Sequence, residues 1–178
     1  MSRGFHRRPE QERESLGFEA RATEEVHQSL RLWLRMMSCN MEIQSVLRRQ
    51  LRSRFGMSLA RFDYMAQVYR HTDGVSMRAL SNYLMVTGGN VTGLTRELQK
   101  EGWVSRALDP HDRRSYLVRL TASGREVFER VANEHESWVV ALFAEMTGDD
   151  RERLTDLLGE VRLLLNKKAD LARLAPRD

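Results

Sequence analysis

Apolar residues recur at steps of three and four positions over much of the chain, which is the spacing of amphipathic helices. The pattern predicts one long helix from Thr23 to about Phe55, a stretch without Gly or Pro. Gly56 then acts as a helix stop, and Ser58 opens a second helix that reaches Tyr69. The first part of the chain is therefore predicted to be helical.

Two more amphipathic helices are predicted in the last third of the chain. Thr121 can cap a helix whose apolar stripe reaches Met146, and Gly148 and Asp149 begin another whose leucine-rich stripe ends at Leu165. Together with the first helix they carry more apolar surface than a small domain can cover. We therefore expect a second copy of the chain to bury it; the alternative is that these helices pack on each other in a monomer.

The segment between these helices has a different character. Ser76 can cap a short helix that closes at Leu84, and Thr87 can cap a second one. The second helix is predicted to bury Val91, Leu94 and Leu98 and to expose Gly89, Thr92, Gly93, Arg96 and Lys100. A short helix with so polar an outer face fits the major groove of DNA.

A hairpin is predicted to follow this helix. Gly102 occupies the position where a left-handed residue ends a helix, and Trp103 follows where a Schellman motif places an apolar side chain against the helix. Trp103 to Leu108 and Tyr116 to Leu120 then read as two short strands. The loop between them, residues 109–115, is charged.

The order helix, turn, helix and hairpin is that of a winged helix. The segment from Ser76 to Gly124 resembles the multiple-antibiotic-resistance regulator (MarR) family. The motifs that carry this resemblance are Thr87-Gly88-Gly89-Asn90-Val91-Thr92, Lys100-Glu101-Gly102-Trp103-Val104, Asp112-Arg113-Arg114 and Leu120-Thr121-Ala122-Ser123-Gly124. The order of the flanking helices extends the resemblance to Thr23–Leu171. It predicts a mainly α fold with a small β-hairpin, in which residues 23–55 and 122–174 form the dimerisation region and residues 56–121 the winged helix-turn-helix.

The resemblance implies a homodimer that presents two recognition helices and two wings to a pseudo-palindromic operator in double-stranded DNA, with half-sites about one helical turn apart. The residues it assigns to DNA are Ser76, Arg78, Thr87, Gly88, Gly89, Asn90, Thr92, Gly93, Arg96, Arg106, Asp112, Arg113 and Arg114. Many relatives have a basic side chain where this chain has Gly88 or Gly93. Backbone approach or DNA shape is therefore expected to contribute more here.

Two arginines at the hairpin tip are the candidates for minor-groove insertion. A guanidinium enters a narrow, negative minor groove favourably, and Asp112 can hold one arginine in position. We expect Arg113 to insert, with Arg114 close behind. The alternative is that the pair only ties the hairpin to neighbouring helices through carboxylates.

An effector is also implied, because regulators of this family commonly respond to small aromatic acids. The sequence of the first two helices is similar to that of the family members that repress aromatic-acid catabolism. In that branch the effector is an aromatic acid or its coenzyme A thioester. An aromatic shelf beside a guanidinium suits an aryl carboxylate. The candidate ligand residues are Arg31, Trp33, Leu34, Met37, Ser38, Arg61, Phe62 and Met65. For Trp33, Met37, Phe62 and Met65 the alternative is a place in the ordinary core.

Composition and charge agree with such a regulator. Of the 178 residues 41% are hydrophobic and 30% charged, as in soluble globular proteins, and the net charge of +4 suits nucleic acid without requiring it. No membrane span or secretory signal is recognisable, so a cytoplasmic protein is expected. Residues 1–22 mix Arg and Glu and are predicted to form a flexible arm; its functional alternative is that Arg7 and Arg8 lie along DNA phosphates.

The lone cysteine, Cys39, cannot form an intrachain disulfide, and with five scattered histidines no metal site or cofactor is indicated. Part of the family senses oxidants through a first-helix cysteine. Among Met36, Met37 and Met41, however, Cys39 is predicted to be a small buried hydrophobe, so redox sensing remains the alternative function.

An enzyme is not indicated. Gly88, Gly89 and Gly93 form a glycine-rich stretch without a following Gly-Lys-Ser/Thr, and His111 beside Asp112 has no nucleophile at a recognisable spacing. The remaining alternative class is an adaptor that kept the winged fold without reading DNA.

Overall fold

The computed structural model describes residues 28–110, 112 and 115–174. The elements in chain order are α2 (Gln28–Phe55), α3 (Leu59–Tyr69), β1 (Val75–Ser76), α4 (Met77–Leu84), α5 (Gly88–Lys100), β2 (Val104–Leu108), β3 (Tyr116–Leu120), α6 (Ala122–Leu142) and α7 (Gly148–Leu174). The predicted arm of residues 1–22, the first turn of the first helix, and Arg113 and Arg114 lie outside the described residues. The predicted fold, mainly α with a small β-hairpin, is confirmed.

The chain divides by its packing into two units, Met1–Val131 and Ala132–Asp178, which are described separately. The first unit holds α2 to β3 and the first half of α6. The second holds the rest of α6 and the whole of α7. The predicted assignment of residues 23–55 and 122–174 to a dimerisation region stays a prediction.

Three short side chains begin the helices of the first unit, as predicted. Ser58, Ser76 and Thr87 have extended backbones, and each side-chain oxygen accepts a hydrogen bond from a backbone N–H three residues ahead. The donors are the N–H groups of Arg61, Ala79 and Asn90, at 3.3, 3.2 and 3.4 Å. These bonds satisfy helix N–H groups that would otherwise lack partners, so the helix starts are determined locally.

The sheet has three antiparallel strands in the order β1-β3-β2. The predicted hairpin is confirmed, with Val104 opposite Leu120 and Leu108 opposite Tyr116. Strand β1 was not predicted, because two residues are too few to show an alternating pattern. It exists because Val75 pairs with Val118 of β3, a contact that only the tertiary fold creates.

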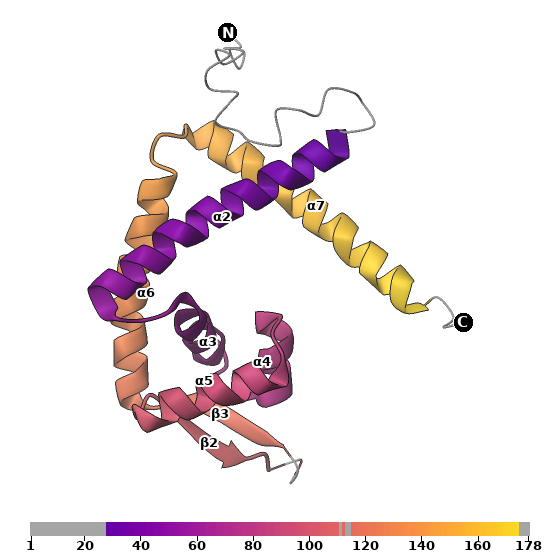
Figure 1. The fold of residues 1–178 in the computed structure, drawn as a ribbon. Coiled ribbons are helices and arrows are strands. Elements are labelled where there is room, and N and C mark those ends of the chain that lie inside the picture. The colour runs from indigo at the N-terminus through magenta and orange to yellow at the C-terminus, as the bar shows by residue number, and fades with distance from the viewer. Residues whose placement is uncertain (1–27, 111, 113–114, 175–178) are drawn as a thin grey trace. The chain divides into compact units, whose positions relative to one another are not determined.

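The hydrophobic core of the first unit lies between α3, α4, α5 and the sheet (Figure 1). Its fully buried side chains include Leu51, Tyr64, Met65, Val68, Leu80, Val91, Leu98 and Val118. Aromatic side chains extend the core toward α6, where the rings of Phe62 and Phe128 stack at 5.6 Å and Tyr69 lies 4.7 Å from Phe128. Helix α3 is therefore the central helix of this unit, in contact with elements on several sides.

One junction joins the end of α5 to the hairpin and to α6. Gly102 has φ of +75°, and the N–H groups of Gly102 and Trp103 donate to the carbonyls of Gln99 and Leu98 at 3.0 and 2.9 Å. This is the Schellman motif that the sequence predicts. The Thr121 hydroxyl donates to the Gly102 carbonyl at 2.6 Å, and the Thr121 N–H donates to the Trp103 carbonyl at 3.0 Å.

Gly124 completes the junction by lacking a side chain. A Cβ at this position would lie 1.9 Å from the Trp103 carbonyl oxygen, which is backbone and cannot move aside cheaply. The first turn of α6 therefore packs directly on the start of β2. Glycine is the residue that allows helix and strand backbones to approach so closely.

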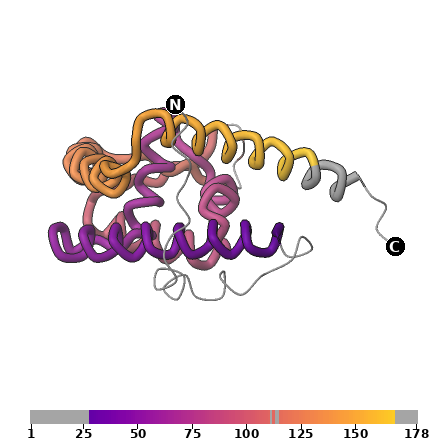
Figure 2. Tube along the Cα trace, turned by 90° about the horizontal axis from the view of Figure 1, so that it is seen from above, coloured from indigo at the N-terminus to yellow at the C-terminus, as the bar shows by residue number. Residues whose placement is uncertain are grey.

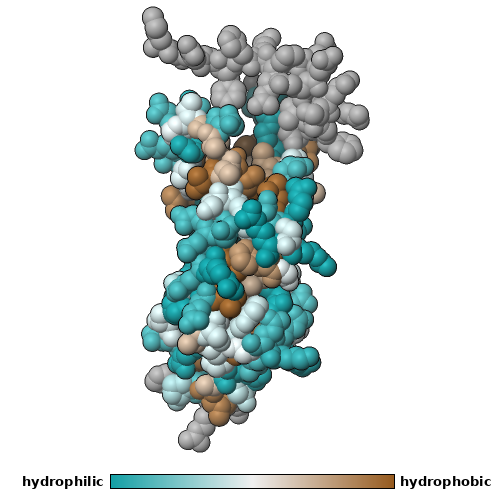
Figure 3. Space-filling model, turned by 90° about the vertical axis from the view of Figure 1, so that its left-hand side faces the viewer, coloured by the Kyte–Doolittle hydropathy of each residue, from teal (hydrophilic) through white to brown (hydrophobic). Residues whose placement is uncertain are grey.

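The two long helices leave apolar side chains uncovered. On α2, one continuous helix in Figure 2, Trp33 is 55% and Met41 64% exposed, and within that helix only Leu47 and Leu51 are buried. On α7, Leu154, Leu157, Leu158, Leu163, Leu164 and Leu165 are all exposed. Figure 3 shows hydrophobic side chains reaching the surface among charged ones.

Cys39 lies on this uncovered part of α2 and is exposed. The prediction that it is a small buried hydrophobe is therefore wrong for the single chain. The sequence pattern groups Cys39 with apolar neighbours, but those neighbours are themselves exposed here.

Within the described residues, no helix is long and apolar enough to cross a membrane. The same residues contain no group of His, Cys, Asp and Glu side chains that could hold a metal ion.

Candidate nucleic-acid interface

The N-terminal half of α5 presents a bare, polar surface. Gly88, Gly89, Asn90, Thr92 and Arg96 are exposed, and Gly93 is half-buried. The predicted outer face of this helix is confirmed. The predicted inner face is partly wrong, because Thr95 is fully buried beside Val91 and Leu98 while Leu94 is only half-buried.

Nothing in the fold of the single chain requires glycine at Gly88, Gly89 or Gly93 of α5. A Cβ at Gly88 or Gly93 would meet no atom within 4 Å, and at Gly89 it would meet only the Thr87 hydroxyl at 3.9 Å. None of the three has a positive φ. Glycine inside a helix costs about 0.8–1.0 kcal/mol relative to alanine, so the absence of a side chain at Gly93, which lies within α5, is a net loss for the free chain. A partner that approaches the helix backbone closely would account for it.

The polar side chains of this surface are partly engaged by the helix itself. The Thr92 hydroxyl donates to the Gly88 carbonyl at 2.9 Å, so its proton is used internally, and the exposed residue also carries a methyl group. Such a methyl group suits contact with a thymine methyl. Arg96, one turn further on, is exposed, and its predicted contact with a phosphate stays a prediction.

The turn between α4 and α5 is held by backbone and side-chain bonds that the sequence did not reveal. Met85 adopts a left-handed conformation with φ of 52° and is 93% exposed. The Ser81 hydroxyl donates to the Val86 carbonyl at 2.5 Å, and the Val86 N–H donates to the Ser81 carbonyl at 3.2 Å. These bonds stabilise the turn that orients the two short helices. Arg78, in the first turn of α4, is exposed.

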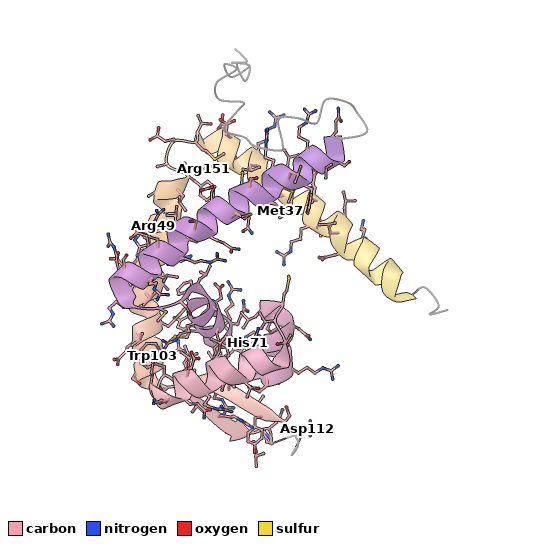
Figure 4. The ribbon with its side chains drawn as sticks, viewed as in Figure 1. Met37, Arg49, His71, Trp103, Asp112 and Arg151 are labelled. Carbon is pink, nitrogen blue, oxygen red and sulfur yellow. The ribbon has the colours of Figure 1, made fainter. Side chains whose placement is uncertain are left out.

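The hairpin carries a guanidinium stacked on an aromatic ring. The Arg106 guanidinium carbon lies 3.6 Å from the centre of the Tyr116 ring, within the range of a cation–π interaction. Both side chains are exposed, so Arg106 is pre-oriented at the surface and can still contact a phosphate. Asp112 lies at the hairpin tip (Figure 4), where its carbonyl accepts the Ser115 N–H at 2.9 Å. Its neighbours Arg113 and Arg114 are not described.

The predicted ligand residues do not form one cluster in the single chain. Five of them, Arg31, Trp33, Leu34, Met37 and Ser38, lie toward the start of α2, where Figure 4 labels Met37. A rise of 1.5 Å per residue puts Met37 about 27 Å along the helix axis from Phe55, the last residue of α2. Phe62 and Met65 are buried in the core of the first unit. The ligand assignment of these residues stays a prediction, and within one chain no described cavity joins them.

Arg61, the predicted carboxylate-binding residue of α3, has partners within the chain. Its Nη2 pairs with the Glu101 carboxylate, and its guanidinium carbon lies 5.0 Å from the centre of the Trp103 ring. Arg61 thus connects α3 to the end of α5 and the start of β2.

A groove between α2 and α3 was not predicted. Its volume is ≈ 370 Å³, and it is lined by Gln44, Arg48, Arg52, Met57, Ser58, Leu59, Ala60 and Asp63. Arg48 donates to the Gln44 side-chain oxygen at 2.5 Å. Loss of water around Asp63 raises the pKa of its carboxyl, and the Arg48 guanidinium opposes that rise. The signal in the sequence is the spacing of Gln44, Arg48 and Arg52, one helical turn apart.

Comparison with known proteins identifies this architecture. The family model described as the MarR family matches residues 55–115. A crystal structure of a MarR family transcriptional regulator from Silicibacter pomeroyi is 32% identical, superposes with a TM-score of 0.69, and covers 80% of this chain and 99% of its own. The chain belongs to the MarR family. It is therefore a DNA-binding transcriptional regulator and not an enzyme.

Two further MarR-type proteins are informative. The transcriptional activatory protein BadR of Rhodopseudomonas palustris is 32% identical over 121 residues, which are 67% of each chain. The MarR family regulator Sco3205 of Streptomyces coelicolor, solved in complex with DNA, is 25% identical with a TM-score of 0.67, over 79% of this chain and 88% of its own. The family resemblance inferred from the motifs is thus confirmed, whereas the aromatic-catabolism branch stays a prediction.

Replacing Gly93 by alanine tests why α5 of this MarR-family chain is glycine-rich. Because a Cβ has open space there, Gly93→Ala is expected to raise the free energy of unfolding by up to about 1 kcal/mol. If DNA approaches the α5 backbone closely, the same variant binds its DNA about tenfold more weakly. Chemical denaturation and a fluorescence-anisotropy titration measure the two effects.

Gly159→Ala is the matched control, since a Cβ at Gly159 within α7 also meets nothing within 4 Å. It should stabilise the chain without changing DNA affinity. Unchanged DNA affinity in Gly93→Ala would contradict close backbone approach.

Proposed function

We propose that this protein is a homodimeric repressor that occupies a pseudo-palindromic operator and leaves it when a small aromatic acid, or its coenzyme A thioester, binds. The observation that carries the proposal is the exposed polar face of α5 beside a hairpin with an outward guanidinium, in a family of DNA-binding regulators. Repression follows from occupancy of the operator. The name of BadR, an activatory protein, makes activation the second candidate.

Exposed leucines support the homodimer. Leu157 and Leu164 lie seven residues apart on α7, on the same helical face, and are 51% and 58% exposed. Burial of a leucine contributes about 1.5–3 kcal/mol, so a contiguous set left in water favours association. A second copy of the chain offers the same two uncovered helices, and a two-fold axis would bring like surfaces together.

Glutamate at both leucines is expected to abolish the dimer. The wild-type protein should sediment as a dimer at micromolar concentration, and Leu157→Glu/Leu164→Glu as a monomer, because two charges would then be desolvated in the interface. Arg153→Glu, an added acid on an exposed polar position of the same helix, is the control. A monomeric wild-type protein in analytical ultracentrifugation would refute the homodimer.

The wing arginines should determine part of the salt dependence of DNA binding. Each lost phosphate or minor-groove charge contact lowers the slope of log K against log salt concentration by about one. Arg113→Ala and Arg114→Ala are therefore each expected to reduce both the affinity for DNA and the slope. Fluorescence-anisotropy titrations at salt concentrations from about 50 to about 300 mM measure both quantities. Arg162→Ala, on the exposed side of α7, removes the same charge outside the proposed interface.

An unchanged slope in both wing variants would favour the other role of the pair, which is to tie the hairpin to carboxylates. If the wild-type protein did not bind DNA at all, the result would favour the alternative class, an adaptor that kept the winged fold without reading DNA.

The effector is proposed to bind in the groove between α2 and α3. Its volume falls within the range of small-molecule sites, and Arg48 and Arg52 supply two guanidinium groups for a carboxylate. The groove is lined by residues of both α2 and α3, and α3 also packs on α4 and α5. A ligand that prefers one arrangement of α2 and α3 would shift DNA affinity by its differential affinity for the two states.

A thermal-shift screen with aromatic acids and their thioesters, followed by DNA titration, tests this proposal. Arg48→Gln should weaken effector affinity about tenfold or more, because hydrogen bonds to charged groups contribute about 1.5–3 kcal/mol. Arg31→Gln is the comparison: if it alone loses the thermal shift, the site is the one predicted from the first third of α2. A ligand that raises Tm without changing DNA affinity contradicts the effector role.

Cys39→Ser separates this proposal from redox sensing. Redox sensing is a third candidate, because Cys39 is exposed in the single chain, where an oxidant can reach it. A variant that keeps the ligand response but loses release by mild peroxide would assign the two responses to different groups.

A further inference from the structure

One buried hydroxyl lies on the inner side of the recognition helix α5. Thr95 is 2% exposed, and among the residues that the structure describes it is the one buried residue whose side chain is not mainly apolar. Its Oγ1 lies 2.6 Å from the Tyr64 hydroxyl of α3, 2.7 Å from the Val91 carbonyl and 3.5 Å from the Met77 sulfur of α4. Tyr64 itself is fully buried. Buried polar groups are costly unless they are paired, so this pairing is part of how α5 is held.

The directions of these hydrogen bonds can be assigned. Thr95 has one hydroxyl proton, and the Val91 carbonyl can only accept, so Thr95 donates to Val91. Tyr64 must then donate to Thr95 Oγ1. Burial raises the pKa of Tyr64 to about 12, so the phenol stays protonated and remains a donor at neutral pH.

Directional hydrogen bonds hold the two ends of α5, at the Thr87 cap and at the Gly102 turn, but between these ends the anchorage is apolar apart from the Thr95 hydroxyl. The other buried side chains of α5 are Val91 and Leu98, whose apolar contacts tolerate rotation of the helix about its axis. Side chains lie about 5–6 Å from a helix axis, so a rotation of about 15° moves an outer side chain by roughly 1.5 Å. A hydrogen bond loses strength over such a displacement, because its geometry is narrow.

We propose that the Tyr64–Thr95 hydrogen bond is the positioning contact that sets the rotation of α5 and so its discrimination between operator and other DNA. Thr92 and Arg96 flank Thr95 in sequence, on the outer side of the same helix, and rotate with it. Phosphate contacts carry no sequence information, whereas hydrogen bonds to base edges do and depend on a narrow geometry. The inference deepens the proposed function, since it rests on α5 reading DNA sequence.

The test uses the full-length chain and two DNA probes. One is the duplex that the wild-type protein enriches from a random library, and the other is a scrambled duplex of the same composition. Tyr64→Phe removes only the donor hydroxyl, and the Thr95 hydroxyl keeps its bond to Val91. We expect affinity for the enriched duplex to fall about fivefold to tenfold, the equivalent of one hydrogen bond, while affinity for the scrambled duplex changes less than about twofold.

Two variants at Thr95 separate positioning from stability. Thr95→Val leaves the Tyr64 hydroxyl buried without an acceptor, so Tm should fall, and Tyr64→Phe/Thr95→Val should recover part of that loss. Discrimination should nevertheless stay low in the double variant and equal that of either single one. Thr95→Ser keeps the hydroxyl and should keep discrimination. If discrimination follows Tm across the series, the contact is only structural and the proposal is overturned.

Tyr69→Phe is the matched control. It removes the same hydroxyl from the same helix, but Tyr69 donates to Glu129 of α6 at 2.9 Å and not to α5. It should leave discrimination unchanged. Full discrimination in Tyr64→Phe would overturn the proposal while the proposed function stands, whereas a wild-type protein that enriches no duplex overturns both.

Discussion

The interface depends on the junction at which α5 ends, β2 begins and α6 starts. The left-handed Gly102 turns the chain, the Thr121 hydroxyl closes on its carbonyl, and Gly124 allows the Trp103 carbonyl to lie against the first turn of α6. Each contact is made by backbone or by a short side chain, so there is little freedom to relax. Helix α5 and the hairpin are therefore held in a constant relation, which the proposed interface with two DNA-reading elements requires.

Helix α3 extends this rigidity inward. Arg61 joins it to Glu101 and Trp103 at the junction, Tyr64 joins it to Thr95 at the middle of α5, and Tyr69 joins it to Glu129 of α6. These three polar contacts are spaced along the length of α3. They orient a helix that is otherwise held by apolar packing. The groove beside Arg48 and Asp63 lies at the start of the same helix. The proposed effector would therefore bind at the helix that carries the Tyr64 contact to α5.

The uncovered surfaces divide by chemistry. The outer face of α5 is polar and lacks side chains at its glycines, which suits a partner rich in hydrogen-bonding groups and phosphates. The uncovered faces of α2 and α7 are rich in Leu, Met and Trp, which suits another apolar surface. One chain therefore presents two kinds of candidate interface.

The helix starts, the two strands of the hairpin and the outer face of α5 could all be predicted from the sequence, because caps, glycine stops and helical periodicity act over a few residues. Ser58, Ser76, Thr87 and Gly102 all have the predicted roles. Only the tertiary structure decided what meets across long sequence separations. The pairing of Val75 with Val118, the burial of Thr95 under Tyr64, the engagement of Arg61 and the groove at Arg48 each join residues that local pattern cannot connect. Periodicity also cannot tell an apolar face buried in its own chain from one left open, which is why Cys39 is exposed where burial was expected.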